Sequence, residues 1–287
     1  MEKSEVKENW YGVLKLVIPY FLVVGLFQYA GILMLGLHFE DLGTQLNSRQ
    51  TLWIMVCTAA GTFLVVWLLR KYRDKGSFAS LGLDHFRLTD VIWGLLMGAV
   101  IMASGYFVLI ATGQIRYLNS TFVPEEMLIN VFFLILVAFS EELLMRGYIL
   151  KNLMGSMNRY GALAVSSCLF SMMHIANADY TWFAAVELFF AGILLGLSYL
   201  YTHNLWFPIA LHFSWNFFQG AIFGFNVSGR HIHSVINHMR IKDNIWNGGA
   251  FGFEGSLLSL FFQLACIVII YFLFRKREST RSADPQR

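Results

Sequence analysis

The sequence predicts an all-α protein, a polytopic bundle of about eight helices that cross a membrane. Its 287 residues are 57% hydrophobic and only 14% charged, whereas soluble domains average roughly 25% charged residues. Several apolar runs reach the ~20 residues that a helix needs to cross a hydrocarbon core of ~30 Å. The high aromatic content, 16% of residues, suits the belts of Trp and Tyr at membrane interfaces. The lipid bilayer is therefore the expected surrounding of the whole chain.

We expect residues 1–287 to form a single integral-membrane domain. The fourth predicted helix begins at Pro124, which two acidic residues follow, and both features are typical of a helix N-terminus. The third carries Gly94 and Gly98, a small-residue face for close helix packing. Residues 276–287 form a polar tail that we expect to be disordered. The predicted spans are Tyr11–His38, Thr51–Leu69, Asp90–Thr112, Pro124–Lys151, Gly161–Ala176, Thr181–Tyr201, Leu205–Phe225 and Ser256–Phe274.

Lys and Arg residues set the expected orientation, because they favour the cytoplasmic side of a membrane. With eight spans, both termini lie on one side, and 16 of the 21 basic residues fall on that side. The sequence thus predicts a cell-membrane protein with both termini in the cytoplasm. The five basic residues on the other side are Arg49, Arg116, Arg230, Arg240 and Lys242.

Net charge and cysteines exclude some classes of function. A net charge of +3 is too small to indicate a nucleic-acid partner. Cys57, Cys168 and Cys266 fall in three different apolar runs without CxxC spacing, so neither a disulfide framework nor a thiolate metal site is predicted.

Two adjacent glutamates interrupt the fourth apolar segment. Met127–Ser140 contains no ionisable side chain, and Glu141 and Glu142 follow it directly. A charge at such depth costs roughly 2.5–3.5 kcal/mol, so it needs a partner and usually has a function. Glu142 and Arg146 stand at i and i+4, which predicts an ion pair that holds this helix in register. Glu141 lies about 100° further round the helix and stays free to act chemically.

Two histidines and an asparagine occupy later spans at a matching depth. At about 1.5 Å per residue, Glu141 and His174 lie ~18 and ~20 Å from the ends of their spans on the side of the termini, and His212 and Asn216 lie at ~10–18 Å. Each residue also has a plainer interpretation, since intramembrane histidines and asparagines often only join helices. Glu187 is interpreted as structural or cavity-lining.

Three histidines in the polar loop before the last span offer a different candidate site. His231, His233 and His238 could bind a metal. No carboxylate or cysteine stands at ligand spacing beside them, so a catalytic site in this loop is not favoured.

Three short motifs at helical spacing follow one another in the second half of the chain. They are Glu141-Glu142-x-x-x-Arg146, Phe170-x-x-x-His174 and His212-x-x-x-Asn216. In this order they resemble the CAAX prenyl protease and bacteriocin-processing (CPBP, or Abi) family of intramembrane proteases. Gly192–Gly196 and Asn204–His212 are also similar to that family. The resemblance covers about residues 124–218, the expected catalytic core, whereas Glu187 and the histidine loop depart from the pattern.

The resemblance implies hydrolysis of a peptide bond inside the membrane, close to the cytoplasmic face. Glu141 would be the general base for a water held by His174, and His212 and Asn216 would stabilise the oxyanion. Glu142 and Arg146 would support the helix. Alternatively, Glu141, His174 and His212 could bind a catalytic Zn²⁺ with one open position, as in a metalloprotease. Of the two, metal-assisted hydrolysis is slightly favoured, because a bound cation would offset the desolvation of a buried Glu141 carboxylate. A prenylated C-terminus, a leader peptide and a membrane-anchored regulator are the candidate substrates.

Two other classes of function stay open at this point. An ion-coupled transporter would also bury carboxylates and histidines, although no internal repeat is visible. A non-catalytic immunity or scaffold protein of the same family would keep the fold. The complete set of candidate catalytic residues favours the protease.

Overall fold

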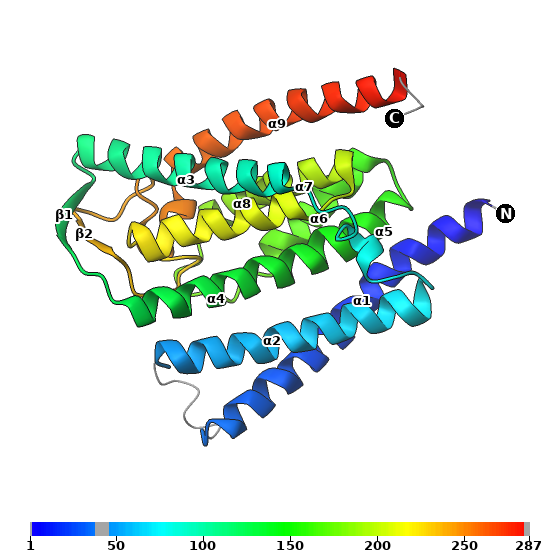
Figure 1. Cartoon of the computed structure of the whole chain (residues 1–287), viewed down its shortest axis with the longest axis horizontal. Helices are drawn as coiled ribbons and strands as arrows, with labels where there is room; N and C mark the ends of the chain where they lie inside the picture. The colour runs from blue at the N-terminus through cyan, green and yellow to red at the C-terminus, as the bar shows by residue number, and fades with distance from the viewer. Residues whose placement is uncertain (1, 38–45, 284–287) are drawn as a thin grey trace.

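The computed structural model describes residues 2–37 and 46–283, and the described chain is a bundle of roughly parallel and antiparallel helices (Figure 1). Helices α1 and α2 form a pair, and α2 packs on α4; α3 packs on α8, and α7 lies between α6 and α9. The predicted all-α membrane bundle is confirmed. The helices are α1 (Glu2–Met34), α2 (Ser48–Leu68), α3 (Leu88–Ala111), α4 (Pro124–Glu142), α5 (Lys151–Met154), α6 (Arg159–Met172), α7 (Trp182–Thr202), α8 (Trp206–Asn216) and α9 (Leu257–Ala283).

Every predicted span corresponds to a helix, but the helices differ in length. Within the described residues, five segments are long and apolar enough to cross a membrane. The sixth and eighth helices and the apolar part of α9 are shorter, so eight crossings remain a prediction. The five long segments are Leu16–Met34, Ser48–Arg73, Leu88–Ala111, Pro124–Met154 and Trp182–Thr202.

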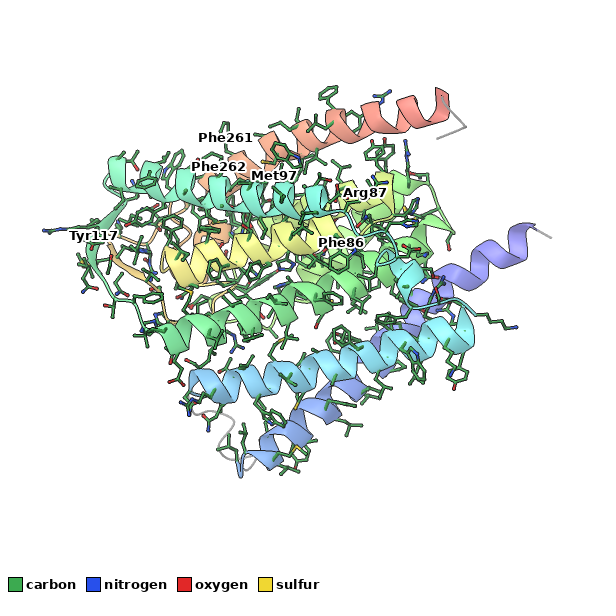
Figure 2. All side chains as sticks on the ribbon, in the orientation of Figure 1. Phe86, Arg87, Met97, Tyr117, Phe261 and Phe262 are labelled. Carbon is green, nitrogen blue, oxygen red and sulfur yellow. The ribbon has the colours of Figure 1, made fainter. Side chains whose placement is uncertain are left out.

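Large apolar side chains cover the outside of the bundle. Phe261 on α9 points to the outside of the bundle (Figure 2), and its side chain is 65% exposed. Trp93 and Phe107 on α3 are exposed to a similar degree. Such a surface is rare on a soluble monomer and matches a multi-pass membrane protein.

Glycines let α3 lie directly against α8, the helix that carries His212 and Asn216. A Cβ at Gly94 would lie 2.7 Å from the carbonyl oxygen of Phe207, and one at Gly98 would lie 2.7 Å from the backbone nitrogen of Trp215. The small-residue face predicted for this span therefore contacts backbone. It sets the position of the helix that presents the third motif.

A two-stranded antiparallel sheet closes one end of the bundle. Strand β1 (Ile115–Ser120) follows α3, and β2 (Ile236–Arg240) lies in the long connection before α9, with Ile115 opposite Arg240. The two ends of the described chain lie at the opposite end of the bundle (Figure 1). The sheet was not predicted. It places the connection between α3 and α4 and the connection between α8 and α9 at the same end of the bundle, as the predicted topology requires.

The C-terminal segment is more ordered than predicted. Helix α9 continues past Arg275 to Ala283, so the expected disorder from residue 276 is wrong up to that point. A helix can continue from apolar into polar residues because its backbone hydrogen bonds are made within the helix itself. Residues 284–287 lie outside the described part.

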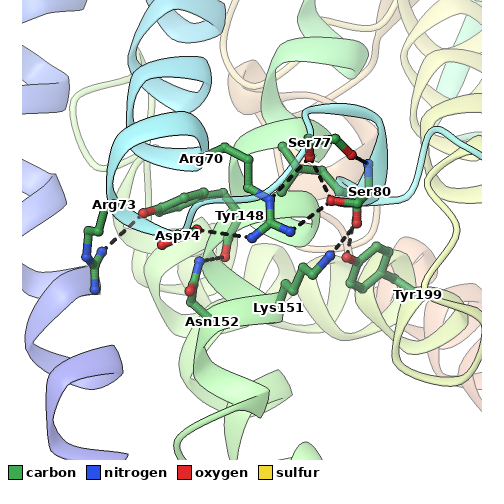
Figure 3. A network of polar contacts seen from close by, with 10 residues as sticks. Arg70, Arg73, Asp74, Ser77, Ser80, Tyr148, Lys151, Asn152 and Tyr199 are labelled. Carbon is green, nitrogen blue, oxygen red and sulfur yellow. Dashed lines mark hydrogen bonds and ion pairs between the residues drawn. The ribbon is translucent and has the colours of Figure 1, made fainter. Parts of the chain in front are cut away.

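A polar network ties the connection between α2 and α3 to the helix that follows the glutamate pair (Figure 3). Arg73 donates a hydrogen bond to the hydroxyl of Tyr148 at 3.1 Å, and Lys151 donates to the carbonyl oxygen of Ser80. Arg70 donates to the hydroxyl of Ser80 at 2.8 Å. These contacts fix the end of the fourth predicted span on the side of the termini.

Candidate active site

The glutamate pair stands where regular α-helix ends. Helix α4 ends at Glu142, and Leu143–Leu150 continue it as a π-helix. π-Helical turns are uncommon and frequently occur at functional sites. Two other π-helical stretches in the described chain are Phe217–Ile222, which directly follows Asn216, and Leu69–Arg73 after α2. The helices of the first and third motifs therefore change geometry at the residues of interest.

Arg146 is buried and contacts a carboxylate, a backbone carbonyl and an aromatic ring. Its Nη1 donates to Oε1 of Glu142 at 2.9 Å, and Nη2 donates to the carbonyl oxygen of Gly192 at 3.1 Å. Its guanidinium lies over the ring of Phe170, with Cζ 4.6 Å from the ring centroid. The structure thus contains the ion pair expected from the i, i+4 spacing. It links α4 to α6 and α7.

Glu142 also contacts His212, a contact that the sequence did not predict. Nδ1 of His212 lies 2.9 Å from Oε1 of Glu142. Because a carboxylate only accepts hydrogen bonds, Nδ1 carries the proton in this pair. Nε2 of a neutral His212 then presents a lone pair, and His212 can donate from Nε2 only as an imidazolium. Glu142 therefore orients the histidine as well as pairing with the arginine.

His174 is oriented in the same way by backbone. Its Nδ1 lies 2.8 Å from the carbonyl oxygen of Phe170, one turn earlier. The carbonyl accepts, so Nδ1 is the protonated nitrogen and Nε2 is a free acceptor. The ring of Phe170 lies beside the imidazole, with centroids 4.9 Å apart. Phe170 thus supports both Arg146 and His174.

Glu141 lies between the two histidines. Its Oε2 is 4.0 Å from Nε2 of His174 and 4.0 Å from Nε2 of His212. Both distances are too long for a direct hydrogen bond, and this oxygen is buried without a hydrogen-bond partner among the described residues. Two groups at this separation are suited to share one water molecule. The side chain is 29% exposed, whereas that of Glu142 is fully buried.

Asn216 completes the set of predicted site residues. It follows His212 by one helical turn and lines the same cavity as Glu141 and His174. Within the described chain its carboxamide makes no hydrogen bond, so its N–H groups are available to a ligand. The structure therefore brings together all four residues that the sequence predicted as catalytic.

The cavity has a volume of about 640 Å³ and is mostly apolar. It extends from Glu141 toward the end of the bundle that carries the sheet, because Leu46, Arg230 and Glu254 line it there. The termini lie at the other end (Figure 1). A site close to the cytoplasmic face and cytoplasmic termini were both expected from the sequence, and both stay predictions.

Sequence reasoning missed Glu254, a buried acid of the cavity wall. It lies in the short 3₁₀ segment Phe253–Gly255 and accepts a hydrogen bond from the backbone nitrogen of Ser228. Burial raises the pKa of Glu254 above its ordinary value. No spacing in the sequence indicates this residue, since its partners come from a loop that folds back over the cavity.

The remaining polar candidates have other partners. Glu187 accepts hydrogen bonds from Ser259 and Gln263 on α9, which supports the structural interpretation. Nδ1 of His238 lies 2.8 Å from the carbonyl oxygen of Phe223, and the carbonyl of His233 accepts from the side chain of Asn130. Among the described residues, the loop histidines form no group that could hold a metal ion.

The candidate zinc ligands were tested against the same geometry. Zinc binds nitrogen at about 2.0–2.1 Å and oxygen at about 2.0–2.2 Å, so tetrahedral ligand atoms lie about 3.4 Å apart. Oε2 of Glu141 is 4.0 Å from each imidazole Nε2. No group of three or more His, Cys, Asp or Glu residues in the described chain could hold a metal ion as placed. Glu141, His174 and His212 have the right chemistry for zinc but not this spacing.

Comparison with known proteins identifies the segment that contains the site. The family model described as "Rce1-like: Type II CAAX prenyl endopeptidase Rce1-like" matches residues 123–218. This segment is similar to type II CAAX prenyl endopeptidases. No curated protein and no solved structure matches the chain. The Rce1-like segment contains α4 to α8 with Glu141, Glu142, Arg146, His174, His212 and Asn216.

Part of the cavity wall lies outside the Rce1-like segment. Ser228, Arg230 and Glu254 all follow residue 218 in the chain. The family match therefore supports a CAAX-type membrane endopeptidase at the level of the family.

Proposed function

We propose that the protein is an intramembrane endopeptidase that hydrolyses a peptide bond in a membrane-associated protein or peptide. The observation that carries this proposal is the position of Glu141, whose Oε2 lies 4.0 Å from Nε2 of both His174 and His212 in one cavity. A carboxylate between two oriented imidazoles can hold and activate a water molecule. The Rce1-like segment supports the same class of reaction.

The first step uses Glu141 as a general base. A water molecule donates one hydrogen bond to Oε2 of Glu141 and one to Nε2 of His174, which accepts because Nδ1 holds the proton. As the water oxygen attacks the carbonyl carbon of the substrate, Glu141 takes the proton. General-base catalysis of this kind contributes about 10²–10⁴-fold.

The oxyanion of the tetrahedral intermediate then needs hydrogen-bond donors. Asn216 can donate from its carboxamide, and His212 can donate from Nε2 once it is an imidazolium. Glu142, 2.9 Å from the other ring nitrogen, stabilises that charge on His212. A preorganised donor at an oxyanion is worth about 3–4 kcal/mol.

The intermediate collapses when the bond between carbon and nitrogen breaks. Glu141 returns its proton to the leaving nitrogen, which departs as an amine, and the other product is a carboxylic acid. One water molecule is consumed and Glu141 is again a carboxylate. No step requires a metal ion.

The family name directs the first choice of substrate. A CAAX box is a C-terminal tetrapeptide whose cysteine carries a prenyl group. A lipid-modified peptide suits a cavity that is mostly apolar and lies within the membrane-spanning helices. A leader peptide and a membrane-anchored regulator are the other substrates to test.

The test is a cleavage assay with the full chain purified in detergent. A farnesylated CAAX peptide is incubated with the protein, and the products are identified by mass spectrometry. We expect one internal cut, lost in His174→Ala and kept in Glu125→Gln, a change at an exposed acid in the first turn of α4. A parent protein that cleaves no prenylated, leader or membrane-anchored peptide would instead support the non-catalytic immunity or scaffold role.

A further inference from the structure

A tight turn places Arg230 in the wall of the cavity. Val227 and Arg230 exchange two backbone hydrogen bonds, both 2.9 Å long. The residues between them, Ser228 and Gly229, have φ angles of +48° and +81°, the left-handed pair of a type I′ hairpin turn. A Cβ at Gly229 would lie 2.0 Å from the carbonyl oxygen of Ala178, so this position requires glycine.

Contacts from the last connection hold the turn in place. The backbone nitrogen of Gly229 donates to the carbonyl oxygen of Phe251 at 2.8 Å, and that of Ser228 donates to the buried carboxyl of Glu254. The turn is therefore fixed between the segment after α6 and the segment before α9. Arg230 is presented by a rigid support.

Arg230 has no acidic partner among the described residues, in contrast to Arg146. Its guanidinium lies 5.9 Å from the ring centroid of Phe133 on α4. The side chain is exposed where it lines the cavity. Arginine is always charged, and its planar group can donate two parallel hydrogen bonds to one carboxylate. The cavity thus contains a cation ready to bind an anionic group.

The distance from Arg230 to the reacting atoms can be estimated along α4, because Arg230 lies beside Phe133. Phe133, Val137 and Glu141 all line the cavity at intervals of four residues, so they form one stripe of the helix. Eight residues of α-helix rise about 12 Å. An extended peptide covers that distance with about three to four residues, at roughly 3.3 Å per residue.

We propose that Arg230 is a specificity-determining residue that binds the terminal carboxylate of the substrate, three to four residues beyond the bond that Glu141 hydrolyses. This inference rests on the proposed endopeptidase function. It explains how one cut near the end of a chain is selected: the carboxylate is held at the turn while the scissile bond lies at Glu141. An acidic side chain at the same distance carries the same chemical group and is the second possible source.

The test compares matched peptides with the full-length protein in detergent. One peptide ends in a free carboxylate three residues after the cut, one ends in an amide, and one ends in an amide but has glutamate at the last position. The parent is expected to cleave the free acid at least 10-fold more efficiently than the amide, mainly through a lower KM, because a terminal amide cannot form the bidentate, charge-assisted pair with Arg230. Arg230→Gln should remove this preference, so that free acid and amide are cleaved with equal efficiency, and Arg230→Lys should keep part of it.

Four other results would overturn either the inference or the proposed function. A free-acid preference that survives in Arg230→Gln overturns the inference, and so does a parent that cleaves acid and amide equally well. A preference for the glutamate peptide over the free acid, lost in Arg230→Gln, overturns the terminal carboxylate as the ligand. A parent that cleaves none of the peptides overturns the proposed function itself.

Discussion

His212 and Glu142 form a buried hydrogen bond of 2.9 Å between the helices of the third and first motifs. The second glutamate of the pair thereby has two partners, Arg146 and His212, on one carboxylate oxygen. This contact explains why two adjacent carboxylates are needed. Glu142 orients the groups around the cavity, and Glu141 faces the space where a substrate would bind.

We predict that Glu142→Ala strongly destabilises the protein. The change leaves the Arg146 guanidinium, which is 1% exposed, without its carboxylate, and removal of one partner of a buried pair costs about 3–5 kcal/mol. Folded yield and the thermal unfolding midpoint in detergent should both fall.

The matched control for this variant is Glu125→Ala on the same helix. Glu125 pairs with Arg49 on the surface, where both side chains are exposed, and such pairs are worth about 0–1 kcal/mol. If both variants unfold at the temperature of the parent, Glu142 does not hold the site together.

A second prediction concerns the packing of α3 on α8. Gly98→Ala should lower both stability and cleavage, because the new Cβ would lie 2.7 Å from backbone of the helix that carries His212. Gly25→Ala is the control: no atom lies within 4 Å of a Cβ there, and alanine is favoured over glycine in a helix by about 1 kcal/mol. Thermal unfolding measured for both variants tests the prediction. Equal stability of the two variants would show that close packing at Gly98 is unimportant.

A third prediction fixes the orientation in the membrane. From the distribution of basic residues, the termini are expected in the cytoplasm. In a background without Cys57, Cys168 and Cys266, an impermeant maleimide should label Lys242→Cys in intact cells and Ser77→Cys only after permeabilisation. Both positions are exposed. The reverse pattern would place the cavity toward the cytoplasm, as the family resemblance implies, and would refute the orientation by charge.

Local spacing made part of the site predictable. The Glu142–Arg146 pair follows from four residues of helix, and the common depth of Glu141, His174 and His212 follows from the rise per residue. The first inference needs only the geometry of a single helix, and the second also needs the predicted ends of three spans. The packing of Gly94 and Gly98 against a neighbour also followed from their spacing, although the identity of that neighbour did not.

Contacts between distant segments were not predictable in this way. The Glu142–His212 hydrogen bond joins residues that are 70 positions apart, and β1 pairs with a strand more than 110 residues later. Neither strand has the alternation of apolar and polar residues that indicates a half-buried sheet. Glu254 reaches the cavity only because the loop before α9 folds over it.

A fourth prediction concerns metal. Because Oε2 of Glu141 is 4.0 Å from each imidazole Nε2, cleavage is expected to continue after chelation, and elemental analysis should find less than one zinc ion per chain. Zinc bound at one per chain, lost together with activity and absent in His174→Ala, would mean that the three residues move closer together around an ion.

The central claim is that Glu141 is the base and does not support the fold. The most direct measurement is the rate of peptide cleavage by Glu141→Gln beside its thermal unfolding midpoint. The amide keeps the size of the side chain but cannot take a proton, so we predict a loss of about 10²–10⁴-fold in rate with an unchanged midpoint. Cleavage by Glu141→Gln at the rate of the parent would contradict the account.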